Sequence, residues 1–426
     1  MSRLRRLGRL AVVDVSPLQQ VRGYRWLFAG MLLAQSGRQL TVVAVPIQIF
    51  LITDSTFAVG LLGLAQLVPL LLVSLAGGAL ADAFDRRALL IMSEVVHIFT
   101  GVGLLWNSLV DDPLLWPLYV FSGISAGTMA IHNPAKQAIV PGLVGRALFP
   151  AALALNQTQT NLAKTAVPAV GGLLIAFAGL STAYSIQTIS YLLSALCFMR
   201  IPRLKAKGGG RTFSMSSIRE GFAFLKSRRL IQAAMLMDLG AMVFGMPSAL
   251  FPAFGTDVLG GDEFTVGLLF AAPGAGAMLA AFTSGWVPKV RRQGRAVAVA
   301  VTCWGLGIAV FGLSRSLPLA LAMLAFAGAA DVVSAIFRQS IIQLSVPDAL
   351  RGRLASIHTI ASGGGPRLGD LEAGVVAEVT SVRFSVVSGG VACAAAALAI
   401  SRWSPRFYNY VYSPDSDVDD EVEVIA

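Results

Sequence analysis

Three basic side chains lie inside long apolar stretches of the sequence: Arg38, Lys164 and Arg367. A charge in the middle of a bilayer costs about 2.5–3.5 kcal/mol or more, so such residues usually face a cavity or a partner. Arg38 and Lys164 have no acidic residue within a helical turn, and we expect them to make a substrate cavity attractive to anions. Arg367 is a third candidate for the substrate cavity. It shares a helix face with Asp370, three residues later, so a neutralising pair of these two residues is the alternative.

Acidic side chains in similar positions are candidates for binding protons. A carboxyl group takes up a proton near neutral pH when burial penalises its charged form. The order of preference is Asp331 and Asp370, then Glu372, Asp238 and Glu94. Glu94 also lies three residues before His97, and the same spacing rule predicts a pair there.

Enzyme chemistry is not indicated. Gly123 to Gly127 reads GISAG, which fits the G-x-S-x-G pattern of serine hydrolases, and His132 lies nearby. That pattern requires a strand, a strained turn and a helix, whereas this one lies in the middle of an apolar run. Ser125 is therefore interpreted as a helix-packing residue. The three cysteines lie singly in apolar segments, so no metal site, disulfide framework or cofactor is predicted.

The elements that position these residues are membrane helices. Hydrophobic residues make up 55% of the chain and charged residues 13%, against roughly 25% charged in a soluble domain. At about 20 apolar residues per span, the 426 residues accommodate about a dozen spans. The first six are predicted at Tyr24–Thr53, Thr56–Ala81, Arg87–Val110, Leu114–Gln137, Phe149–Ala178 and Thr182–Ile201. The other six are predicted at Leu230–Phe254, Phe264–Val287, Ala296–Leu313, Leu317–Ile342, Leu354–Val379 and Phe384–Trp403.

The two sets of spans are related by an internal repeat. Phe57 and the residues after it recur from Phe264, and the same displacement carries Gly78 onto Gly285. Duplicated halves around a central site are typical of secondary transporters. The predicted domains are an N-terminal six-helix half (1–201), a cytoplasmic linker with a surface helix (202–229), a C-terminal six-helix half (230–403) and an acidic cytoplasmic tail (404–426). Ile218, Phe222 and Leu225 form the apolar face of the linker helix.

Basic residues indicate the orientation, because cytoplasmic loops retain Lys and Arg. With both termini in the cytoplasm, all but five of the 33 basic residues fall on the cytoplasmic side. The exceptions are Arg315 and Arg383 outside and Arg38, Lys164 and Arg367 within spans. This topology explains the net charge of +10 without a nucleic-acid partner. The basic N-terminus is followed by a short run broken at Asp14, so no signal peptide is predicted.

The segment Gly78 to Arg87, GALADAFDRR, resembles the loop signature of the major facilitator superfamily. The matching positions are Gly78, Asp82, Arg86 and Arg87. Ala83 and Asp85 depart from the signature, at positions where a basic residue and a glycine are usual. The resemblance implies that Asp82 lies at a helix N-terminus across the interface of the two halves and stabilises the outward-open state.

Further segments resemble particular branches of this superfamily. VPAVGG in the fifth span is similar to an antiporter signature and carries Pro168, Gly171 and Gly172. GGPRLGDLEAG (364–374), VAVPIQIF (43–50) and VPDALRGR (346–353) resemble the branch that includes enterobactin (siderophore) exporters. This branch leads one to expect an acidic or small residue at Arg38, so no proton carrier is assigned to the first span.

Together these features predict an all-α integral membrane protein with the major facilitator fold, twelve transmembrane helices in two pseudosymmetric six-helix halves. The resemblance implies a monomeric, proton-coupled exporter in the bacterial cytoplasmic (inner) membrane, working by alternating access. Its expected partners are protons, the lipid bilayer and a small-molecule substrate, with an anionic siderophore or similar metabolite preferred. A multidrug efflux antiporter is the alternative within transport. A non-transporting receptor or channel is the alternative of another class.

Overall fold

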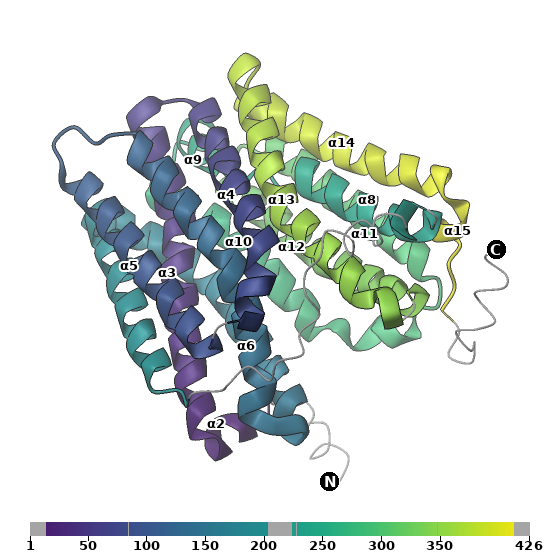
Figure 1. Ribbon diagram of the computed structural model, residues 1–426. Coiled ribbons are helices and arrows are strands. Elements are labelled where there is room, and N and C mark those ends of the chain that lie inside the picture. The colour runs from purple at the N-terminus through teal and green to yellow at the C-terminus, as the bar shows by residue number, and fades with distance from the viewer. Residues whose placement is uncertain (1–13, 84, 203–223, 227, 347, 413–426) are drawn as a thin grey trace, which may run out of the picture. The chain divides into compact units, whose positions relative to one another are not determined.

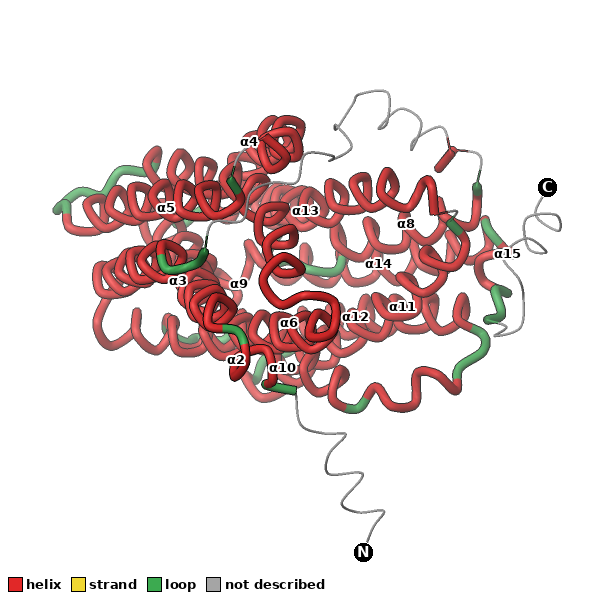
Figure 2. Tube along the Cα trace, turned by 60° about the horizontal axis from the view of Figure 1, so that its bottom comes forward, coloured by secondary structure: helices red, strands yellow, loops and turns green. Residues whose placement is uncertain are grey.

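A computed structural model describes residues 14–83, 85–202, 224–226, 228–346 and 348–412, without the side chains of residues 75–83, 288–289, 348–357 and 359–360. The described residues form helices joined by short loops, and no strand occurs among them (Figures 1 and 2). This is the arrangement expected in lipid, where an α-helix satisfies its backbone hydrogen bonds within one segment.

The N-terminal part of the chain contains the long helices of the first predicted set. They are α2 (Ser16–Gln20), α3 (Arg22–Thr53), α4 (Thr56–Ala83), α5 (Arg86–Leu109) and α6 (Trp116–Met199). At about 1.5 Å per residue, α6 is several times longer than a bilayer is thick. Gly145 and Gly179 interrupt it with φ angles of 69° and 79°, a conformation that glycine adopts without steric cost. These two breaks divide α6 close to the predicted loops.

The C-terminal part contains the second set and several short elements. They are α8 (Arg229–Phe244), η1 (Ser248–Leu250), α9 (Phe251–Ala253), η2 (Phe254–Val258), α10 (Glu263–Phe282), η3 (Ser284–Lys289), α11 (Gln293–Leu313), α12 (Leu317–Ser345), α13 (Asp348–Val379), α14 (Val382–Trp403) and α15 (Pro405–Tyr408). The seventh span, predicted as continuous from Leu230 to Phe254, is interrupted after Phe244. The interruption contains Pro247, which cannot donate a backbone hydrogen bond.

Within the described residues, nine helices are long and apolar enough to cross a membrane. Large apolar side chains are exposed along them, including Phe177 at 84% and Phe282 at 73% of their maximum area. In a membrane these side chains contact lipid rather than water. The prediction of an all-helical membrane protein is confirmed, and the number of twelve spans stays a prediction.

Contacts between Cα atoms divide the chain into two compact units. Unit 1 comprises Met1–Val45 and Val68–Thr212, and unit 2 comprises Pro46–Leu67 and Phe213–Ala426. In unit 1, α5 packs against α6 around buried residues such as Tyr24 and Phe198. In unit 2, α11 packs against both α12 and α14, and α13 packs against α8.

Two predicted features lie partly or wholly outside the described residues. Ile218 and Phe222 of the linker helix are not among them, whereas Leu225 is helical and packs with Ile231 and Met235. The acidic tail from Asp415 to Glu423 is also outside them.

Candidate functional site

Two cations of unit 1 lie within electrostatic reach of a third, Lys136. Lys136, on the first segment of α6, interacts with Arg38 on α3 and with Lys164 on the second segment of α6. Arg38 and Lys136 are partly buried and Lys164 is exposed. We call Arg38, Lys136 and Lys164 the cation row. Its combined field favours an anion near these helices.

Lys136 was not predicted as a site residue, because the fourth span was expected to end at Gln137 and its basic residues were counted as cytoplasmic. The helical segment instead continues to Val144, just before the break at Gly145. Arg338 was assigned to the cytoplasmic side for a similar reason, and α12 continues past it to Ser345. A search for charged residues in the last two turns of each apolar run would have found both.

Beside Arg38 lies a buried polar cluster formed by Glu94 and His97 of α5 and His132 of α6. Their exposed fractions are 0%, 1% and 3%. Glu94 Oε1 lies 3.6 Å from His132 Nδ1, while the ring of His97 stacks on Tyr191 with centroids 4.9 Å apart. Glu94 therefore contacts His132 on the neighbouring helix α6, whereas the sequence predicted a pair with His97 on its own helix. Arg38 supplies an opposite charge to Glu94, which the sequence spacing did not show.

In unit 2, Asp370 on α13 binds the interrupted seventh span. Its Oδ1 accepts hydrogen bonds from Ser248 Oγ at 2.6 Å and from the backbone N of Ala249 at 2.9 Å. On the other side of the interruption, Trp304 Nε1 of α11 donates to the Gly245 carbonyl at 2.7 Å. Two neighbouring helices thus hold the backbone groups that the interruption leaves without helical partners.

The remaining groups around Asp370 have different partners. Arg367 interacts electrostatically with Asp370 but donates its hydrogen bond to the carbonyl of Gly363, one turn earlier on α13. Glu372 on α13 and Asp331 on α12 are partly buried, and Asp331 has an interaction partner of its own.

The segment 364–374 packs closely on both of its sides. A Cβ atom added at Gly369 would lie 2.6 Å from the Val243 carbonyl oxygen of α8. One added at Gly374 would lie 2.6 Å from the Thr56 carbonyl oxygen of α4. Gly63 of α4 is similarly close to the Arg367 carbonyl oxygen, at 2.3 Å. The glycines of this segment therefore allow backbone-to-backbone contact with two helices.

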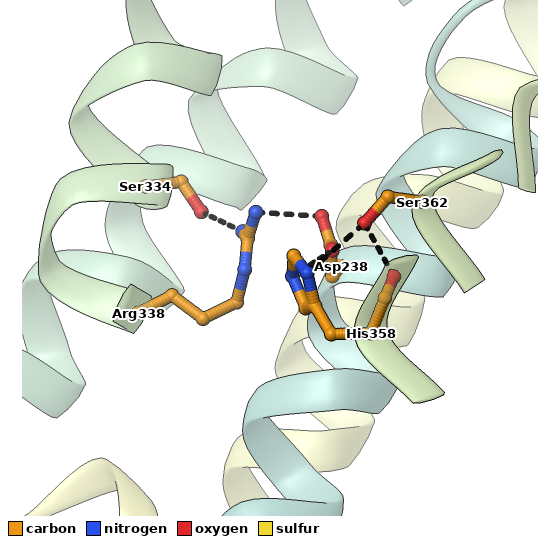
Figure 3. Close-up of polar contacts among 5 residues, drawn as sticks. All are labelled: Asp238, Ser334, Arg338, His358 and Ser362. Carbon is orange, nitrogen blue, oxygen red and sulfur yellow. Dashed lines mark hydrogen bonds and ion pairs between the residues drawn. The ribbon is translucent and has the colours of Figure 1, made fainter. Parts of the chain in front are cut away.

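Asp238 of α8 forms the centre of a buried ion triad with Arg338 of α12 and His358 of α13 (Figure 3). Arg338 Nη2 lies 2.6 Å from Asp238 Oδ1, and both side chains are 3% exposed. His358 Nε2 lies 3.2 Å from Asp238 Oδ2, and its side chain is 27% exposed. Arg338 Nη1 also donates to Ser334 Oγ at 2.8 Å. Sequence analysis singled out Asp238 and missed its partners, which lie about a hundred residues away.

The predicted gating loop is described in part. Gly78 and Asp82 lie in the last turns of α4, and their side chains are outside the described ones. Arg86 Nη1 donates to the Ala138 carbonyl at 2.7 Å, and Arg87 donates to the Met199 carbonyl. Asp85, one of the departures from the family signature, caps α5 by accepting from the Arg87 backbone N at 2.9 Å.

The residues of the antiporter-like segment are buried within unit 1. Pro168, Gly171 and Gly172 lie in the second segment of α6, and Gly171 faces Leu40 of α3. Among the described residues, no group of His, Cys, Asp and Glu side chains is arranged to hold a metal ion.

Comparison with known proteins places these features in context. The family model described as transmembrane secretion effector matches residues 13–414. The enterobactin exporter EntS of Citrobacter koseri is 28% identical over 383 residues, which are 89% of this chain and 91% of the exporter. Enterobactin exporter EntS of Escherichia coli is 27% identical over the same share of each chain.

Solved transporter structures share the fold at low sequence identity. A POT family transporter in complex with 5-aminolevulinic acid has a TM-score of 0.73 at 11% identity, covering 91% of this chain and 97% of its own. A bacterial homologue of the lysosomal transporter Spinster, inward-facing and unoccupied, has a TM-score of 0.71 at 16% identity, covering 92% and 99%. A bacterial homologue of the iron transporter ferroportin, in an inward-facing state, has a TM-score of 0.69 at 15% identity, covering 90% and 99%.

Proposed function

Because the chain belongs to the transmembrane secretion effector family of the major facilitator superfamily, and is a multi-pass membrane transporter rather than an enzyme, we propose that it exports an anionic siderophore or similar metabolite. The relatives named as enterobactin exporters, matched over nine tenths of both chains, support export and this class of substrate.

The cation row of unit 1 is the observation that carries the substrate assignment. Arg38 and Lys136 are partly buried cations on two different helices, and the exposed Lys164 extends the same positive field. Neighbouring positive charges repel one another, so their arrangement is stabilised when an anion lies between them. Catecholate and carboxylate siderophores carry such negative charge, whereas the lipophilic cations of multidrug exporters would be repelled.

Proton coupling is the second part of the proposal. The candidate carriers are the intramembrane carboxylates Asp331, Asp370, Glu372, Asp238 and Glu94. Arg367, Pro168, Gly171, Gly172 and the gating-loop residues are assigned to the cavity and to the moving helices. Both termini lie in the cytoplasm in this proposal, and the monomer is the transporting unit.

The substrate is tested by comparing cells with and without the chain under iron limitation. We expect an iron-chelating anion to accumulate inside the deletion strain. Tolerance changes confined to lipophilic cations would instead support a multidrug exporter. If no solute distribution depends on the chain, the transport proposal fails and a receptor role is favoured.

The carboxylates are tested in proteoliposomes that contain the full chain. Asp331→Asn and Asp370→Asn remove the titrating group with little change of volume. Loss of coupled export with normal membrane insertion identifies a carrier, and undiminished export from both variants excludes these two positions.

A further inference from the structure

The ion triad of unit 2 contains one group that is fixed in its charge. Arg338 stays protonated in proteins, and its guanidinium lies 2.6 Å from Asp238 Oδ1 with both side chains 3% exposed. A proton on Asp238 would leave this buried guanidinium without a counter-charge, which is strongly unfavourable. The member of the triad whose charge can change while this ion pair is kept is the third partner, His358.

The contacts of His358 place a polar partner beside each ring nitrogen. Ser362 Oγ lies 2.8 Å from the His358 carbonyl oxygen and 3.3 Å from His358 Nδ1 (Figure 3). The hydroxyl has a single hydrogen, and the carbonyl can only accept, so the shorter contact takes that hydrogen. Nδ1 then donates to Ser362 Oγ. On the other side of the ring, Nε2 lies 3.2 Å from Asp238 Oδ2, which is an ion-pair contact when the ring is protonated.

His358 is also the most exposed of the three histidines. Its side chain is 27% exposed, compared with 1% for His97 and 3% for His132. Glu94 and His132 form a second carboxylate–histidine contact, but both side chains are enclosed in unit 1, at 0% and 3% exposure. Exchange of a proton with water requires the partial exposure that His358 has.

We propose that His358, and not Asp238, is the member of this triad that binds a proton in the transport cycle, with Asp238 as the positioning residue that stabilises its charged form and Arg338 as the fixed counter-charge. This assignment rests on the proton coupling proposed above. The charged groups in contact with His358 among the described residues are Asp238 from α8 and, through Asp238, Arg338 from α12. A proton from water adds to the neutral imidazole, and the same ring nitrogen returns it to water.

The arrangement links this proton to helix movement. Asp238 and Arg338 connect α8 to α12 through Oδ1, whereas His358 connects α13 to the same carboxylate through Oδ2. If α13 separates from α8, the imidazolium loses its nearest negative charge and releases its proton. If α13 returns, the carboxylate again favours the charged ring. Protonation of His358 thus favours the arrangement in which α8 and α13 are joined.

The protonation state is measured directly by nitrogen NMR of histidine-labelled protein in lipid nanodiscs. The chain has three histidines, and the signal lost in His358→Gln assigns His358. We expect both ring nitrogens of His358 to carry hydrogen at neutral pH, and most of this signal to convert to the neutral form in Asp238→Asn. A neutral His358 ring throughout the mildly acidic range overturns the proposal.

The role in transport is measured in proteoliposomes, with enterobactin as the probe. Wild-type protein is expected to move protons when the probe gradient is imposed, and His358→Gln to reduce this flux about tenfold or more while exchange of the probe across the membrane continues. Arg315→Gln, in an exposed loop, is the control for loss of a basic residue.

The outcomes separate the two proposals. Undiminished proton flux in His358→Gln overturns the assignment of His358 and leaves proton coupling intact. Absence of proton flux in the wild-type protein overturns the proposed coupling, and the transport role of His358 with it. The NMR result then shows whether the imidazolium is a structural charge of unit 2.

Discussion

Single charged residues of this transporter find their partners on other helices. Glu94 contacts His132 rather than the nearby His97, and Asp238 contacts Arg338, a hundred positions away. Spacing rules along one helix identify residues on a common face, but the choice of partner depends on which helices pack together. The sequence therefore predicted that charged residues lie within the membrane, but it did not predict which of them form pairs.

Lys136 provides a test of the cation row at the scale of one residue. In Lys136→Gln we expect the KM for an anionic probe such as enterobactin to rise about fivefold with kcat nearly unchanged, because a partly exposed charge contributes about 1 kcal/mol to binding in both ground and transition states. Export rates at a series of probe concentrations measure this. Lys226→Gln, outside the membrane-spanning helices, is the matched control. An unchanged KM would remove Lys136 from the substrate site.

Substitutions of Asp370 test whether its buried carboxylate stabilises the interrupted seventh span by accepting hydrogen bonds. Both of its hydrogen bonds end on Oδ1, so Asp370→Asn keeps an acceptor there while Asp370→Ala leaves the Ala249 N–H and the Ser248 hydroxyl without one. An unsatisfied buried donor costs about 1–3 kcal/mol, so the alanine variant is expected to unfold at lower temperature. Thermal unfolding in detergent compares the two. Equal stability of both variants would contradict this role.

At the scale of elements, the apolar runs determine most helix boundaries to within a few residues. The interruption at Pro247 was missed although the proline was visible in the sequence. The reason is that Pro46 in α3 and Pro69 in α4 lie inside helices that continue past them. A proline alone does not end a membrane helix. Here Asp370 and Trp304 satisfy the released backbone groups, and these residues come from distant parts of the chain.

Glycine residues allow the helices α4 and α13 to pack closely against each other. A Cβ at Gly63 would lie 2.3 Å from the Arg367 carbonyl oxygen, so Gly63→Ala forces two backbones apart. We expect lower thermal stability and reduced yield of folded protein. Gly285→Ala is the matched control, because a Cβ there has no atom within 4 Å. Equal stability of the two variants would show that α4 and α13 separate without cost.

The start of α10 offers a pH-dependent test outside the membrane. Asp262 caps this helix, and the hydrogen bond from the Thr265 backbone N holds the pKa of its carboxyl below the usual value. A carboxyl with a lowered folded pKa stabilises the fold above its unfolded pKa of about 3.9 and loses this contribution as pH falls below that value. Asp262→Ala is expected to cost about 1 kcal/mol near neutral pH. The difference in free energy of unfolding between Asp262→Ala and the wild type should decrease as the pH falls into the acid range. A difference that does not depend on pH would show that the charge of Asp262 does not contribute to capping.

At the scale of the whole molecule, the sequence repeat predicted two halves of six helices, and the structure groups the chain into two compact units with a different boundary. The later part of α3 and the first part of α4 belong to unit 2. The repeat describes how the chain is built, whereas compactness describes which segments pack together in one state of a moving protein. The repeat carries no information about which state is populated, so this grouping was not predictable from it.

Glu378 connects the end of α13 to the start of α4 within unit 2, at the ends predicted to face outside. Its Oε2 accepts from Ser55 Oγ at 3.0 Å, Thr56 Oγ at 3.2 Å and the Phe57 backbone N at 3.1 Å. Alternating access requires helix ends on the releasing side to separate, so these bonds favour the state in which α4 and α13 are joined. Glu378→Ala removes all three bonds.

We expect Glu378→Ala to shift the protein towards outward opening by about 1–2 kcal/mol, or roughly tenfold in population. The measurement is labelling of Ala58→Cys, a buried position next to these bonds, by a membrane-impermeant maleimide, in a background in which the three native cysteines are replaced. Labelling from outside should accelerate in the Glu378→Ala variant and be restored towards the wild-type rate in Glu378→Gln, whose amide oxygen still accepts. Equal labelling rates in all three would show that this carboxylate does not determine which state is populated.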